Sequence, residues 1–245
     1  MTMTETETRI ETEALEFARE HKKELARRLT DPTKYPRESN PVSVFMAASP
    51  GAGKTEASIE LLASFGSPTI IRIDPDELRS EFSTYSGGNA WLFQMAISVL
   101  VDKIHDMVLD QKQSFLLDGT LSHYDKALKN IQRSLKKGRI VQILYVYQAP
   151  MQAWTFVQAR EAKEGRHIRP EDFIQQYFAA RGVVNRLKTE LGKAIRLDLL
   201  MKNNDNSTQF YRAGMDQIDN HIPEQVGQQE LEHLLGLKSA SNGPT

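Results

Sequence analysis

The 245-residue sequence has no cysteine, no long hydrophobic run and no excess of charge of either sign. Without cysteine there are no disulfides, thiol nucleophiles or cysteine-bound metal sites. The longest apolar stretch, from Phe93 to Val101, contains Gln94 and Ser98 and is much shorter than the ~20 residues that a membrane-spanning helix needs. The net charge of −1 lacks the basic surplus that is typical of nucleic-acid-binding proteins. We therefore expect a cytoplasmic protein without a nucleic-acid or membrane partner.

Strand and helix patterns alternate through the centre of the chain. Apolar, β-branched runs predict strands at 42–47, 69–73, 114–117, 140–147 and 194–199. Helical periodicity predicts helices at 54–64, 89–110, 122–137, 150–164 and 170–191, with Ser122 as the cap of the third. Because the first strands are apolar nearly throughout, they indicate a parallel sheet covered by helices on both faces. The predicted fold class is α/β.

Three regions are expected along the chain. Residues 1–40 form a polar tail, disordered to about residue 8, and an amphipathic helix from Arg9 to Leu29. This helix either covers the core of its own domain or docks a partner. Residues 41–200 form the core, with a lid around 160–170, and residues 201–245 form a carboxy-terminal extension.

A glycine-rich segment follows the first predicted strand and precedes a helix, which is the context of a P-loop. Glycines let the backbone wrap around phosphate oxygens, and the helix amino terminus presents unpaired N–H groups to them. Lys54 would reach the β- and γ-phosphates of ATP, and the Thr55 hydroxyl would bind Mg²⁺. Ala48 stands where the usual pattern has glycine, which puts a Cβ in the turn. The expected nucleotide-binding residues are Ser49, Pro50, Gly51, Ala52, Gly53, Lys54 and Thr55.

Acidic residues follow the second and third strands, whose carboxyl ends line the ligand crevice in a parallel sheet. Asp74 suits a helix cap, with Pro75 at the first helical position and Glu77 completing a capping box. Asp76 is the candidate base, because a kinase needs a carboxylate that accepts the proton of the attacking hydroxyl. Asp118 either binds Mg²⁺ or is an ordinary turn residue.

Arginines surround Gly165 between two predicted helices. Arg160, Arg166 and Arg169 could stabilise the charge that develops on the transferring phosphate. A short arginine-bearing segment between helices is typical of a lid. Because acidic and basic residues alternate here, the alternative is a solvated charged loop.

The combined motifs resemble the zeta toxin family, the toxin halves of bacterial epsilon/zeta toxin–antitoxin systems. The resemblance spans about 42–199 and rests on residues 50–55, on Ile73-Asp74-Pro75-Asp76 with Arg79, on 117–120, and on Arg160 and Gly165-Arg166. It implies an adenylate-kinase-like P-loop NTPase sheet, ATP and Mg²⁺ as cofactors, and an antitoxin partner. It also implies phosphorylation of UDP-N-acetylglucosamine, or a related UDP-sugar, on a sugar hydroxyl.

The resemblance also assigns roles to individual residues. It implies that Lys54, Asp76, Arg160 and Arg166 are catalytic, with Arg169 as the alternative to Arg166. It implies that Arg79, Asp102 and Thr120 bind the substrate, although Asp102 stands where relatives have glutamate. Asp118 likewise replaces a frequent glutamate. Two other functions stay open: a P-loop kinase of a nucleoside or dinucleotide, and a non-enzymatic, ATP-dependent regulatory module.

Overall fold

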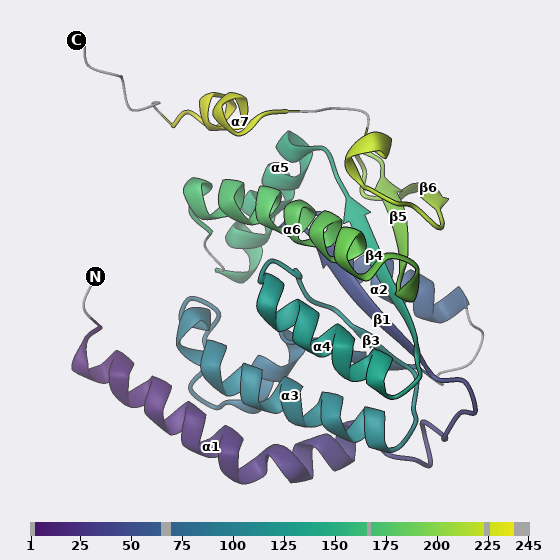
Figure 1. Cartoon of the computed structure of the whole chain (residues 1–245). Helices are drawn as coiled ribbons and strands as arrows, with labels where there is room; N and C mark the ends of the chain where they lie inside the picture. The colour runs from purple at the N-terminus through teal and green to yellow at the C-terminus, as the bar shows by residue number, and fades with distance from the viewer. Residues whose placement is uncertain (1–2, 65–69, 166–167, 223–225, 238–245) are drawn as a thin grey trace.

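The computed structural model describes residues 3–64, 70–165, 168–222 and 226–237, which form a layered α/β structure (Figure 1). Its strands are β1 (Val42–Ala48), β2 (Ile71–Ile73), β3 (Phe115–Leu117), β4 (Ile140–Tyr147), β5 (Arg196–Lys202) and β6 (Thr208–Arg212). They form one sheet in the order β2-β3-β1-β4-β5-β6. The first five strands are parallel, and β6 pairs with β5 in the antiparallel sense at one edge.

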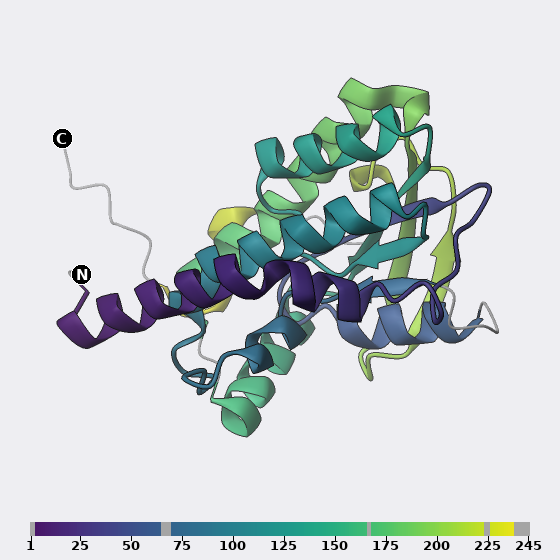
Figure 2. The same ribbon diagram turned by 90° about the horizontal axis from the view of Figure 1, so that it is seen from below.

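The helices are α1 (Glu5–Leu29), α2 (Lys54–Ser64), α3 (Gln94–Asp110), α4 (Tyr124–Lys136), α5 (Pro150–Glu164), α6 (Pro170–Leu191) and α7 (Gln228–Leu234). Short 3-10 helices are η1 (Glu77–Glu81), η2 (Ala90–Phe93), η3 (Gly192–Ala194) and η4 (Asp219–His221). Figure 2 shows α2 on the opposite side of the sheet from α3 and α4. The predicted α/β fold with helices on both faces is therefore confirmed.

Alternation along the central strand β1 explains the two layers. Phe45 and Ala47 point into the large core beneath α1, α3, α4 and α6. Val44, Met46 and Ala48 point the other way, into a smaller core with Ala52 and Ala57 beside and within α2. Because side chains alternate between the faces of a strand, a strand buried on both faces must be apolar at nearly every position.

The amino-terminal helix starts earlier than the sequence indicates. The Thr4 side chain accepts the Glu7 N–H while the Glu7 carboxylate accepts the Thr4 N–H, which forms a capping box. The prediction of disorder to about residue 8 is therefore wrong for residues 4–8. Small buried residues, Ala14 and Ala18, let α1 pack closely against α3, so this helix covers its own domain.

Three further local predictions need correction. The chain after β2 forms the short 3-10 helix η1, in which Asp76 is the cap position, rather than a helix beginning at Pro75. Ser122 does not cap α4, because its hydroxyl lies 3.0 Å from the Thr120 hydroxyl and α4 begins only after His123. The strand predicted at 194–199 is shifted, since β5 runs to Lys202 to pair with β6.

Candidate nucleotide-binding and phosphotransfer site

The carboxyl ends of three neighbouring strands lie side by side at one end of the sheet. β2, β3 and β1 are parallel neighbours, so the segments that follow them start side by side. The P-loop follows β1, Asp74 follows β2 and Asp118 follows β3. This shared end brings together, from three distant parts of the sequence, most of the residues that the motifs single out.

The P-loop needs glycine at two positions for conformation, and at Gly51 also for space. Gly51 and Gly53 have φ of 72° and 77°, in the left-handed region that side chains rarely adopt. A Cβ at Gly51 would overlap the Ala153 carbonyl oxygen in α5, and one at Gly53 would overlap the Asn206 side chain between β5 and β6. Ala48, by contrast, has a negative φ and is a fully buried residue of β1, so its Cβ causes no strain.

Lys54 begins α2 beside the acidic side chains. Burial lowers the pKa of its ammonium group, while the carboxylates of Asp118, Asp76 and Asp74 oppose that shift. Its neighbour Thr55 faces the main cavity at this end of the sheet. A cation and a hydroxyl thus stand together at the helix amino terminus, where phosphate oxygens bind.

Two buried carboxylates, Asp74 and Asp118, share one arginine. The Arg72 Nη2 atom lies 2.8 Å from Asp118 Oδ2 and also donates to Asp74 Oδ2. Burial, and then the nearby Asp118 charge, raise the pKa of Asp74, which Arg72 opposes. The Ser58 hydroxyl lies 3.2 Å from the same Asp118 oxygen. Sequence reasoning missed Arg72, although a charged residue within the apolar run 70–73 was a usable signal.

Asp76 stands between two arginines. Arg79 donates to Asp76 Oδ1, and Arg160 Nη2 lies 3.5 Å from Asp76 Oδ2. The Asp76 N–H donates to Asp74 Oδ1 at 2.7 Å, so Asp74 fixes the turn before η1 instead of capping a helix that begins at Pro75. Glu77 does not complete a capping box, because its carboxylate pairs with Arg72 at 2.5 Å instead. The predicted base and one predicted lid arginine therefore lie together.

A cavity of about 450 Å³ opens beside Asp76. Its described lining combines P-loop, acidic and lid residues with a loop that the sequence did not single out: Thr55, Asp74, Asp76, Glu77, Tyr85, Ser86, Gly87 and Arg160. The loop is held in place because Tyr85 packs edge-on against Phe93 and Asn89 bonds to both Ser86 and Thr84. The cavity is large enough to receive parts of a ligand between α5 and the loop at 85–87.

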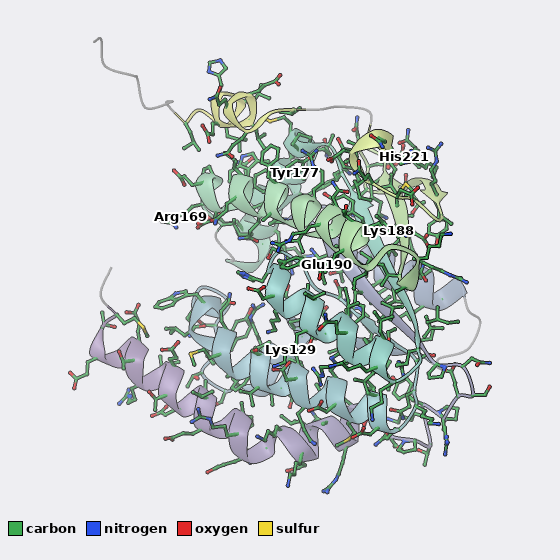
Figure 3. All side chains as sticks on the ribbon, viewed as in Figure 1. Lys129, Arg169, Tyr177, Lys188, Glu190 and His221 are labelled. Atoms are coloured by element: carbon green, nitrogen blue, oxygen red, sulfur yellow. The ribbon has the colours of Figure 1, made fainter. Side chains whose placement is uncertain are left out.

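The remaining predicted site residues lie elsewhere. Asp102 is on α3, where Oδ1 is 3.9 Å from Arg133, and neither it nor Thr120 is among the described residues that line the cavity. Arg169, at the start of α6 (Figure 3), pairs with Asp172 at 2.7 Å. Arg166 lies outside the described residues.

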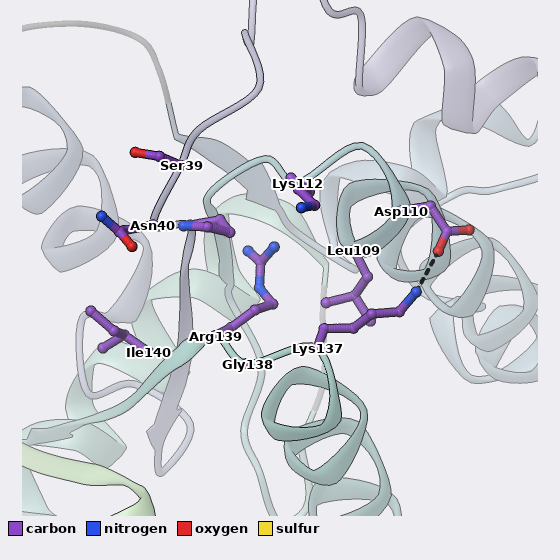
Figure 4. Close-up of a pocket in the computed structure, with 10 residues that line it drawn as sticks. Ser39, Asn40, Leu109, Asp110, Lys112, Lys137, Gly138, Arg139 and Ile140 are labelled. Atoms are coloured by element: carbon purple, nitrogen blue, oxygen red, sulfur yellow. Dashed lines mark hydrogen bonds and ion pairs between the residues drawn. The ribbon is translucent and has the colours of Figure 1, made fainter.

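A second cavity, of about 150 Å³, lies at the amino-terminal ends of the strands, beside the segments that precede β1, β3 and β4. Figure 4 shows residues that line it. There the buried Arg139 donates to Ser43 Oγ at 2.7 Å and to the carbonyl oxygens of Val42 and Gln113. Burial lowers the pKa of Arg139 to about 10. These bonds tie the starts of neighbouring strands together, so Arg139 has a structural role.

Oxygen ligands suited to Mg²⁺ are present but few. The Thr55 hydroxyl and the Asp118 carboxylate are hard donors of the kind that Mg²⁺ prefers. Among the described residues there is no group of three or more histidine, aspartate or glutamate side chains placed to hold a metal. This pattern fits Mg²⁺ that is bound mainly through water and nucleotide phosphates. Within the same residues, no helix is long and apolar enough to cross a membrane.

Comparisons with known proteins identify the family and the fold. Among solved structures, the chain is similar to one from the PezAT chromosomal toxin–antitoxin system of Streptococcus pneumoniae, with a TM-score of 0.65 and 19% identity over 96% of this chain and 94% of that one. It is also similar to the AvrRxo1-ORF1:AvrRxo1-ORF2 complex with sulphate ions, with a TM-score of 0.55 and 15% identity over 95% and 80% of the two chains. No curated protein sequence matches. The sequence model of the zeta toxin family matches residues 26–216. The chain therefore belongs to the zeta toxin family, whose members are P-loop phosphotransferases.

Proposed function

We propose that this protein uses ATP to phosphorylate a sugar hydroxyl of UDP-N-acetylglucosamine or a related UDP-sugar. One observation carries the proposal: Asp76 opens into the same cavity as Thr55 of the P-loop and Arg160 of α5. A proton acceptor, a phosphate-binding loop and a lid cation are the parts that phosphoryl transfer to an alcohol requires. A structural neighbour that was solved with ATP supports the choice of nucleotide.

The roles follow from the chemistry of each group. Lys54 and the glycine loop bind the phosphates, and Thr55 and Asp118 hold Mg²⁺, which when bound neutralises charge on the phosphate oxygens. Asp76 accepts the proton of the acceptor hydroxyl as its oxygen attacks the γ-phosphorus. The bond from that phosphorus to the bridging oxygen breaks, ADP leaves, and the proton stays on Asp76 until solvent takes it.

Arg160 has to change partners during this reaction. In the ligand-free chain it lies 3.5 Å from Asp76, and its side chain is about half exposed, at 45%. The γ-phosphate offers a stronger partner, because charge-assisted bonds to phosphate oxygens are short and bidentate. A move of Arg160 to the phosphate would take its positive charge away from Asp76, the proposed acceptor of the hydroxyl proton. Nucleotide binding would thus prepare the base.

The acceptor is inferred from charge. The cavity combines Arg160 with the carboxylates of Asp74, Asp76 and Glu77. Carboxylates suit the hydroxyl and amide groups of a UDP-sugar. A nucleoside or dinucleotide acceptor would use the same base, which makes it the main alternative. A non-enzymatic, ATP-dependent module would need no proton acceptor at Asp76.

An antitoxin protein is the proposed macromolecular partner. The neighbour from Streptococcus pneumoniae belongs to a toxin–antitoxin system, and the chain covers 94% of its length. A kinase that consumed a cell-wall precursor would have to be restrained in its own cell, so a bound inhibitor protein fits the proposed activity.

The test is to incubate the protein with Mg-ATP and a panel of UDP-sugars, nucleosides and dinucleotides, and to look for products one phosphate heavier by mass spectrometry. Asp76→Asn should keep ATP binding and cut turnover by roughly 10²–10⁴-fold, as loss of a general base does. Asp106→Asn is the matched control, because Asp106 also pairs with an arginine but lies on α3, with a side chain 55% exposed.

Each alternative has its own outcome. If nucleosides or dinucleotides were phosphorylated and UDP-sugars were not, the acceptor would be a nucleoside or dinucleotide. ATP loss without a phosphorylated acceptor would favour the regulatory module. If Asp76→Asn turned over normally, the assignment of the base would be wrong.

A further inference from the structure

Arg72 joins four separate segments of the site. It lies on β2, and its side chain is only 12% exposed. Nε donates to Ser58 Oγ on α2 at 2.8 Å, and Nη1 donates to Glu77 Oε1 on η1 at 2.5 Å. Nη2 contacts both Asp118, which follows β3, and Asp74, which follows β2. All three guanidinium nitrogens therefore have a partner at this one end of the sheet.

These contacts fix the orientation of Asp118. Arg72 donates to Oδ2 at 2.8 Å, and the Ser58 hydroxyl, which also donates to the Thr55 carbonyl oxygen at 2.7 Å, lies 3.2 Å from the same Asp118 oxygen. A carboxylate whose Oδ2 is bound by a guanidinium and lies against a hydroxyl cannot rotate freely, so the direction of Oδ1 is fixed as well. Oδ1 is thus the oxygen that is positioned for the metal or for a water molecule on it.

The same guanidinium also fixes the turn that carries Asp76. Asp74 receives Arg72 on Oδ2 and the Asp76 N–H on Oδ1, at 2.7 Å for the latter. Glu77, the next residue along, is held by the Arg72 Nη1 atom. Arg72 therefore holds the side chains of Asp74 and Glu77, which lie before and after Asp76 in this turn.

We infer that Arg72 is the positioning residue of the phosphotransfer site, which aligns Asp118 for Mg²⁺ and aligns the Asp76 turn for the acceptor hydroxyl. The inference rests on the proposed function. Two buried carboxylates this close repel one another, and a single shared cation keeps them together. Lysine cannot replace arginine here, because one ammonium group lacks the planar fork that reaches four oxygens in different directions.

The test compares Arg72→Lys with Arg139→Lys. Arg139 is a matched control because it is also a buried arginine that binds several oxygens, but at the amino-terminal ends of the strands. The affinity for a fluorescent ATP analogue is measured in EDTA and again in saturating Mg²⁺, without any acceptor. The ratio of the two affinities reports the contribution of the metal, and thermal melts check folding.

Arg72→Lys should bind the metal-free analogue like the wild type but lose roughly 10–100-fold of the Mg²⁺-dependent gain, the usual effect of removing a residue that orients a metal ligand. Its kcat should fall while the KM for the acceptor changes little. Arg139→Lys should lower the melting temperature and leave the ratio unchanged. Equal ratios for wild type, Arg72→Lys and Arg139→Lys would overturn the inference.

A second variant covers the case in which Arg72→Lys does not fold. Ser58→Ala removes the hydroxyl that accepts the Arg72 Nε proton at 2.8 Å and keeps every charge, so it should loosen Arg72 and reduce the Mg²⁺-dependent gain in the same direction. An unchanged ratio in Ser58→Ala would then overturn the inference. Because the ratio is measured without an acceptor, failure of the wild type to phosphorylate any acceptor would refute the proposed function and leave this test intact.

Discussion

Lowering the pH should destabilise the fold through His105, a fully buried residue of α3. Its ring packs edge-on against Phe45 and Phe115, with ring centroids 6.0 and 4.9 Å away. Burial lowers the pKa of His105 from 6.5 to about 3, and the positive charges of Arg133 and Arg139 act in the same direction. The imidazole is therefore neutral in the folded protein down to strongly acidic pH.

The sign and size of the effect follow from proton linkage. Above pH 6.5 the ring is neutral in both states and contributes nothing. Below that, the unfolded chain binds a proton that the folded chain excludes, so stability falls by about 1.4 kcal/mol per pH unit until the folded pKa is reached. Between pH 6.5 and 4.5 this one group should remove about 2 kcal/mol from the free energy of unfolding.

Urea unfolding followed by circular dichroism at both pH values measures the effect. His105→Leu introduces an apolar side chain of similar size that cannot be protonated. Between pH 6.5 and 4.5 its free energy of unfolding should therefore fall by about 2 kcal/mol less than that of the wild type. His123→Gln, at an exposed position before α4, is the control and should behave like the wild type. Parallel pH profiles for wild type and His105→Leu would refute the reasoning.

Two predictions concern the phosphotransfer site. Lys54→Ala should abolish product formation with folding intact by circular dichroism, because its ammonium group would act on the β/γ-phosphates; near-normal turnover would remove the P-loop argument. Arg160→Ala should lower kcat more than it raises the KM for ATP, since charge on the transferring group is greatest in the transition state, and Arg160→Lys should restore little. Arg169→Ala should be milder, because Arg169 already pairs with Asp172. A larger loss of kcat in Arg169→Ala than in Arg160→Ala would reverse these assignments.

The sequence predicts the sheet and the P-loop well because their signals are local. The apolar, β-branched runs 42–47 and 140–147 predict strands, and the glycines of the loop precede a helical pattern directly. Acids placed after neighbouring parallel strands had to converge on one end of the sheet, which is why Asp74, Asp76 and Asp118 were found.

The parts that could not be predicted depend on contacts between distant segments. Nothing near Arg72 in the sequence indicates that its partners are Ser58 and Asp118, since the pairing arises only when β2 and β3 align. The loop at 85–87 lines the cavity because Tyr85 packs against Phe93, and no local sequence pattern predicts that contact. Ser122 looked like a helix cap, but its hydroxyl pairs with Thr120.

The walls of the P-loop come from later parts of the chain. Gly51 packs against Ala153 at the start of α5, and Gly53 packs against Asn206 between β5 and β6. During synthesis from the amino terminus, the nucleotide loop leaves the ribosome long before either wall exists. An incomplete chain that ends with β5 carries the whole motif but lacks Asn206. The order of translation thus delays assembly of the complete P-loop surroundings until the segment after β5 has been made.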